Sequence, residues 1–226
     1  MRRKLNVLFV LPEFDCSTQY GYYFFHYFNI ERIASYYYNV IKLEKERALN
    51  VYVIEAIKKY DPVLIFGYGH GAWNLYTSQD KSPTFADPTG VAKEIPQLKV
   101  IVKKGNSEIL SERIVYLLTC NVGRGLGRVA VSKGCRAFIS FKDDFVWCSE
   151  GRYPLEDDIS YYFFKPAYQV LRKILEGYTV YDAFLSFKYE SLKYLDELDE
   201  TARKTLLFNI KNMVLIGERY AKMGYS

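Results

Sequence analysis

Residues 63–71 read VLIFGYGHG, and residues 114–127 read IVYLLTCNVGRGLG. Each stretch opens with a short, continuous apolar run, which is typical of a parallel strand buried on both faces. The first run leads into His70, and the second leads into Cys120. In an open α/β sheet, ligands bind where the carboxyl ends of the strands meet. We therefore expect His70 and Cys120 to lie at one edge of a sheet.

The remaining sequence supplies more strands and the helices that would cover them. Short apolar runs predict strands over residues 5–11, 137–141 and 214–216, with weaker candidates over 39–43 and 98–102. Helical spacing of apolar residues predicts helices over residues 31–38, 49–60, 128–133 and 159–175, and a further one from residue 180. Strands that alternate with helices predict an α/β sandwich with a mainly parallel central sheet.

The organisation of the chain is expected to be simple. Residues 72–96 contain turn formers and no clear period, so we expect a long surface loop there. The sequence shows no repeat, low-complexity tract or linker. One domain over residues 1–226 is the simplest interpretation.

Composition narrows the possible functions. The net charge is 31 − 26 = +5 with no basic block, which gives nucleic-acid binding little support. No signal peptide or membrane-spanning run is visible, and we expect neither a membrane partner nor a nucleic-acid partner. The four cysteines form no C-x-x-C pair, and two histidines cannot build a three-histidine metal site. We expect free thiols, no metal or other cofactor, and a cytoplasmic location; the oligomeric state stays open.

The two motifs suggest nucleophilic chemistry. A thiol such as Cys120 needs a base to become a thiolate at neutral pH, and His70 across the same sheet edge could serve. The backbone N–H groups of Gly71 and Cys120 could then form an oxyanion hole. A histidine beside glycines can also be a turn residue, and a cysteine that ends a buried strand often only packs. His26 lies in the aromatic run 20–28 and is expected to be structural.

These residues resemble the caspase-like (clan CD) cysteine peptidases, and more closely the gingipain-type and CHAT-domain branches than animal caspases. In that superfamily one apolar strand leads to His-Gly, and a later one leads to the catalytic cysteine. Here Cys120 follows His70 by 120 − 70 = 50 residues, close to the separation of about 50 in caspases. The stretches GCRAFISF (134–141), LEGYTVYDAF (175–184) and MVLIGE (213–218) are similar to later parts of those families.

The resemblance implies a caspase-like α/β/α sandwich and a cysteine endopeptidase that acts on a peptide or protein substrate. Cys120 would be the nucleophile, His70 would protonate the leaving amine and later activate water, and Gly71 and Cys120 would hold the oxyanion. Relatives that prefer arginine or lysine before the scissile bond (the P1 residue) use acidic residues near these strands. We therefore expect Asp15, Asp143 and Asp144 to bind a basic P1 side chain, unless they are solvated loop residues.

Two alternatives stay open. Thr119-Cys120 replaces the Q-A-C of caspases and Gly217-Glu218 replaces a closing Gly-Asp, so animal-caspase specificity and processing are not implied. A catalytically silent caspase-like module that binds a partner is one alternative. The other is a flavodoxin-like nucleotide or flavin binder with Gly123-x-Gly-x-Gly near the phosphate, although that spacing differs from G-x-G-x-x-G.

Overall fold

The computed structural model describes residues 4–77, 100–151 and 153–224. The strands are β1 (Asn6–Leu11), β2 (Asn39–Glu44), β3 (Leu64–Tyr68), β4 (Gly71–Ala72), β5 (Leu75–Thr77), β6 (Val100–Lys103), β7 (Ile114–Leu118), β8 (Ala137–Phe141) and β9 (Met213–Gly217). The α-helices are α1 (Cys16–Tyr27), α2 (Ile30–Tyr37), α3 (Asn50–Tyr60), α4 (Leu126–Ser132), α5 (Asp158–Leu175), α6 (Val180–Leu192) and α7 (Glu200–Asn212). Short 3-10 helices include η3 (Lys104–Leu110) and η4 (Val122–Arg124).

Six strands form the central sheet in the order β2-β1-β3-β7-β8-β9. All neighbours pair in parallel except β8 and β9, which are antiparallel. Every residue of β3, β7 and β8 is buried, as expected for parallel strands covered on both faces. The predicted mixed α/β fold with a mainly parallel sheet is confirmed.

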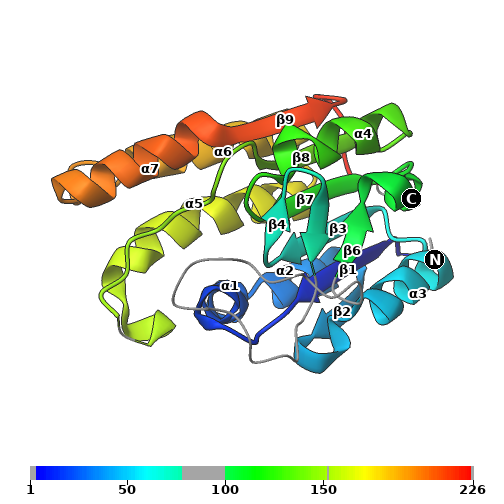
Figure 1. Ribbon diagram of the computed structural model, residues 1–226, viewed down its shortest axis with the longest axis horizontal. Coiled ribbons are helices and arrows are strands. Elements are labelled where there is room, and N and C mark those ends of the chain that lie inside the picture. Colours follow the sequence, from blue (N-terminus) through cyan, green and yellow to red (C-terminus); the bar gives the residue numbers. More distant parts are fainter. Residues whose placement is uncertain (1–3, 78–99, 152, 225–226) are drawn as a thin grey trace.

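Helices cover the two faces of this sheet and build two cores. Side chains of β1 alternate between them: Phe9 packs with the large core under α1, α2, α5 and α6, whereas Leu8 and Val10 pack with the core under α3 and α4. Figure 1 shows α5, α6 and α7 on one side of the molecule and α3 on the other. The sheet is therefore the middle layer of an α/β/α sandwich, and its strand ends are held from both sides.

The aromatic run 20–28 belongs to the larger core and is mostly helical. It lies in α1, whose Phe24 stacks on Phe164 of α5 with ring centroids 4.8 Å apart. The sequence pattern indicates a turn just before this run. The structure begins α1 at Cys16 instead, because Asp15 caps the helix and accepts a hydrogen bond from the Thr18 amide.

Part of the expected loop over residues 72–96 is ordered differently. A second small sheet has the order β4-β5-β6, with antiparallel pairing throughout, so residues 71–77 form a hairpin rather than loop. The rest of the expected loop, 78–96, lies outside the described residues. The hairpin matters for the site because it begins directly after His70.

None of the described helices has the length and apolar character needed to cross a bilayer.

Candidate active site

The sheet places His70 and Cys120 near the same edge. Strands β3 and β7 are parallel neighbours with Tyr68 opposite Leu118, and each candidate residue lies two positions beyond its strand. Asp15 follows β1, the other neighbour of β3, so three chemistry-bearing side chains come from three adjacent parallel strands. The topology therefore produces the arrangement expected for a ligand-binding edge.

His70 is paired with Asp15. Its Nε2 atom lies 2.6 Å from Oδ2 of Asp15. An ionised carboxylate only accepts hydrogen bonds, so Nε2 carries the hydrogen and donates it. Burial raises the pKa of Asp15, but hydrogen bonding and charge from His70, together with hydrogen bonds from Thr18, outweigh it and hold that pKa below its ordinary value. The carboxylate therefore stays ionised at neutral pH and fixes the ring of His70.

Two threonines, Thr18 and Thr77, hold Asp15 and His70 in place. The side-chain oxygen Oδ1 of Asp15 accepts from the amide and hydroxyl of Thr18, which leaves Oδ2 for the histidine. The carbonyl oxygen of His70 accepts from both the amide and the hydroxyl of Thr77 on β5. The histidine is thus held through its ring by Asp15 at the start of α1 and through its backbone by the small hairpin.

Gly71 brings the two motifs into backbone contact. A Cβ atom at this position would lie 2.8 Å from the carbonyl oxygen of Cys120 and 2.8 Å from Oγ1 of Thr119. Only glycine allows the chain after His70 to approach the chain around Cys120 so closely. The glycine that follows the histidine is therefore required by the packing of the two strand ends.

The Cys120 thiol lies in an environment that favours its protonated form. Burial is the largest cause that raises its pKa, Asp144 and Asp143 add to the effect, and the Phe145 amide opposes it; the result is a pKa of about 11. The main influences on the thiol are therefore burial, the Phe145 amide and the two carboxylates after β8. Cys120 and His70 share an edge of the sheet.

The loop after Cys120 is tied to the loop after β8. Asn121 has a left-handed backbone with φ of 61°, its amide donates to the carbonyl oxygen of Asp143, and its Nδ2 donates to Oδ1 of Asp144 at 2.6 Å. The three acidic residues expected to form one P1 site therefore have different surroundings. Asp15 binds His70, Asp144 binds Asn121 near the thiol, and Asp143 lines a separate cavity beside Arg124.

A cavity of about 580 Å³ opens beside the two motifs. It is lined by Gly71, Ala72, Trp73, Asn121 and Arg124. Trp73 is 53% exposed and carries the Lys104 ammonium 3.7 Å from its ring centroid. The other tryptophan, Trp147, packs between Tyr20 and Phe164. The cavity has a size that suits a peptide side chain or a short backbone segment.

The glycines after Cys120 serve close packing. A Cβ on Gly123 would lie 2.6 Å from Val214, one on Gly125 would lie 2.3 Å from the carbonyl oxygen of Trp73, and one on Gly127 would lie 2.7 Å from Phe138. Each glycine therefore faces protein atoms where a phosphate cradle would leave space for a ligand. This packing accounts for the Gly-x-Gly-x-Gly pattern without a nucleotide.

Of the other cysteines, Cys16 directly follows Asp15, whereas Cys135, Cys148 and His26 have partners elsewhere. Cys135 is buried, and Cys148 packs against the larger core. Cys16 is exposed at the start of α1, and His26 lies 2.9 Å from Glu44. Within the described ranges, no group of three or more His, Cys, Asp or Glu side chains could hold a metal ion.

Sequence reasoning missed several residues of the site. It assigned Asp15 to substrate binding and did not pair it with His70, although Asp15 and Thr18 have the spacing of a helix N-cap. It also assigned no role to Asn121, Thr77 or Arg124. No spacing in the sequence indicates the contacts of Asn121, because its partners Asp143 and Asp144 follow a different strand, β8.

Solved structures with a similar fold exist. A complex of the Porphyromonas gingivalis RgpB pro- and mature domains is 12% identical with a TM-score of 0.58, and the comparison covers 96% of this chain and 47% of that one. The crystal structure of the Arg-specific cysteine proteinase gingipain R (RgpB) is 12% identical with a TM-score of 0.53, covering 98% and 48%. The chain thus spans about half the length of these structures. No protein-family model and no curated protein sequence matches it.

Proposed function

We propose that this chain is a caspase-like cysteine endopeptidase that uses Cys120 as nucleophile and His70 as general acid and base. The observation that carries the proposal is the Asp15–His70 pair beside the backbone contact of Gly71 with Cys120. A histidine oriented by a carboxylate, next to a cysteine at the end of a neighbouring strand, is the arrangement that nucleophilic catalysis requires. The fold shared with gingipain R adds support.

In the proposed reaction, His70 takes the proton of the Cys120 thiol, and the sulfur attacks the carbonyl carbon of the scissile peptide bond. The amides of Gly71 and Cys120 stabilise the negative oxygen, and His70 donates a proton to the leaving amine as the C–N bond breaks. His70 then takes a proton from water, which attacks the thioester and releases the acid and the free thiol. Because Nε2 of His70 is engaged by Asp15, we assign these transfers to the second ring nitrogen, Nδ1.

We further propose a preference for arginine or lysine before the scissile bond. Support comes from the two carboxylates after β8, of which Asp144 lies near enough to the thiol to raise its pKa. Asp15 contributes by orienting His70, so its role in this proposal differs from the substrate contact expected from the sequence. The Arg specificity of gingipain R agrees with a basic P1 residue.

The state of the Cys120 thiol favours a second candidate, a silent module that binds peptides without cleaving them. Its supporting observation is the raised pKa of Cys120, which leaves the thiol protonated at neutral pH.

Cleavage of a mixed peptide library, read by mass spectrometry, separates the two candidates. The peptidase proposal predicts cleavage after arginine or lysine that disappears in Cys120→Ala and His70→Ala and persists in the control Cys148→Ala. An intact library after incubation with folded wild-type protein would refute the peptidase and favour the silent module.

A further inference from the structure

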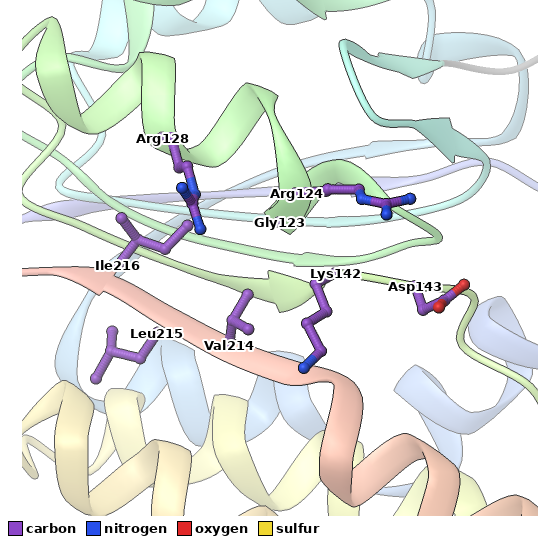
Figure 2. A pocket seen from close by; sticks show the side chains of 8 residues that line it. All are labelled: Gly123, Arg124, Arg128, Lys142, Asp143, Val214, Leu215 and Ile216. Atoms are coloured by element: carbon purple, nitrogen blue, oxygen red, sulfur yellow. The ribbon is translucent and has the colours of Figure 1, made fainter.

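A second cavity, of about 510 Å³, lies next to the candidate active site. Its lining residues come from three segments: the loop and helix after Cys120 (Gly123, Arg124 and Arg128), the end of β8 (Lys142 and Asp143) and the edge strand β9 (Val214, Leu215 and Ile216). Figure 2 shows Arg128 pointing from α4 toward β9 and Lys142 running beside Val214. Arg128 on α4 and Lys142 after β8 therefore place positive side chains beside the apolar residues of β9.

Within the part of the chain that the structure describes, the positive charges in this cavity have no acidic partner in an ion pair. Among the described residues, no carboxylate lies within 4.0 Å of the side-chain nitrogens of Arg124, Arg128 or Lys142, whereas Arg136 and Lys133 nearby pair with Glu218 and Glu108. The one acidic lining residue, Asp143, lies at the far end of the cavity from Arg128 in Figure 2. In Figure 2 the Lys142 ammonium points away from Arg128, so two acidic side chains in the cavity would each meet one cation at a separate place.

The cavity is connected to the candidate active site through one residue. Arg124 lines both this cavity and the one beside Gly71 and Asn121. In addition, the Asn121 amide donates to the carbonyl oxygen of Asp143, so the loop after Cys120 is fastened to the loop after β8.

We propose that this cavity binds an acidic segment of the substrate, with Asp or Glu side chains placed a few residues from the scissile bond. This inference rests on the proposed peptidase function and adds a second determinant to it. Arg128 and Lys142 would contact the carboxylates, and Val214 and Ile216 would contact the aliphatic parts of the same side chains. The substrate would then be dipolar: basic before the scissile bond and acidic at a distance from it.

A peptide scan with matched charge tests this inference. Fluorescent peptides carry one arginine and a pair of Glu residues, or a pair of Gln residues, moved stepwise along either side of it. Binding is measured by anisotropy with the Cys120→Ala variant, so the result does not depend on cleavage. We expect one register in which Glu peptides bind about fivefold to tenfold more tightly than Gln peptides at low salt, with the difference lost at high salt.

Two charge-removing variants locate the effect. Arg128→Gln and Lys142→Gln, each in the Cys120→Ala background, should reduce the Glu-to-Gln preference to less than about twofold. Lys133→Gln serves as the matched control, since Lys133 is the C-cap residue of α4, the helix that carries Arg128, but pairs with Glu108. The Lys133→Gln control should keep the Glu-to-Gln preference. Loss of the preference would then depend on the cavity residues and not simply on the net charge of the protein.

The possible outcomes separate this inference from the peptidase proposal. Equal binding of Glu and Gln peptides in every register would overturn the inference, even if wild-type protein cleaves both. An Arg128-dependent preference without cleavage by the wild type would support the cavity and refute the peptidase. Tight binding of inorganic pyrophosphate together with equal binding of the peptides would assign the cavity to a small anion and overturn the inference.

Discussion

Nε2 of His70 lies 2.6 Å from Oδ2 of Asp15, and this contact joins the ends of two adjacent parallel strands. It engages Nε2 of the histidine, so in the proposed reaction proton transfer is assigned to Nδ1. It also keeps a negative charge behind the ring, which would stabilise the imidazolium formed during catalysis. The role of His70 in the proposed reaction depends on this relationship.

Replacing Asp15 with asparagine tests the contact directly. In Asp15→Asn the new side chain still caps α1 well, so the helix should persist, but the charge behind His70 is lost. We expect kcat/KM for peptide cleavage to fall by about tenfold or more. Asp199→Asn is the matched control, because Asp199 caps α7 in the same way without a histidine. An unchanged kcat/KM in Asp15→Asn would remove Asp15 from the mechanism.

The same pair makes a prediction about stability and pH. Burial raises the pKa of Asp15, but its bonds to His70 and Thr18 outweigh burial and hold the folded-state pKa below its ordinary value. Ionised Asp15 therefore stabilises the fold above about pH 4, and this contribution is lost as the pH falls through the lower folded-state pKa. Urea unfolding from about pH 5 to about pH 3 should show a smaller loss of stability in Asp15→Asn than in wild type. Equal losses of unfolding free energy in Asp15→Asn and in wild type would contradict the lowered pKa of Asp15.

Asp144 is expected to restrain the reactivity of Cys120. Burial first, and then the charge of Asp144, raises the pKa of the thiol to about 11. Asp144→Asn removes that charge, so the pKa should fall and alkylation of Cys120 by iodoacetamide at about pH 8 should accelerate. Peptide mapping distinguishes Cys120 from the exposed Cys16. The exposed Asp196→Asn serves as control; an equal rate in both variants would show that Asp144 does not act on the thiol.

Gly71 is expected to tolerate no side chain. A Cβ there would lie 2.6 Å from Val122 and 2.8 Å from the Cys120 carbonyl oxygen, so Gly71→Ala must displace one strand end. We expect a loss of about 1–3 kcal/mol in the free energy of unfolding and loss of peptide cleavage. Gly105→Ala is the control, since its Cβ would meet nothing closer than 3.9 Å. Similar stabilities of the two variants would contradict the close approach.

The regular elements near the site were predictable from the sequence because short apolar runs indicate strands that are buried on both faces. The predicted strands over residues 114–118 and 137–141 have the bounds of β7 and β8, and α5 ends at Leu175 as predicted. This is why His70 and Cys120 could be placed at one edge before the structure was known.

Other parts of the site depend on contacts between distant segments, and the sequence does not encode these by spacing. The hairpin β4–β5 is short and Tyr76 is its main buried residue, so no apolar run marked it. Asp15 and Asp144 carry the same side chain, yet one binds His70 and the other binds Asn121. Only the arrangement of the strand ends distinguishes their roles.

The most direct test of the central claim is labelling with a peptidyl acyloxymethyl ketone that ends in arginine, followed by intact mass measurement and peptide mapping. The proposed mechanism predicts a single adduct on Cys120 that is absent in His70→Ala and unaffected in Cys16→Ala. Labelling of Cys16 in place of Cys120, or no adduct on folded wild-type protein, would contradict Cys120 as the nucleophile.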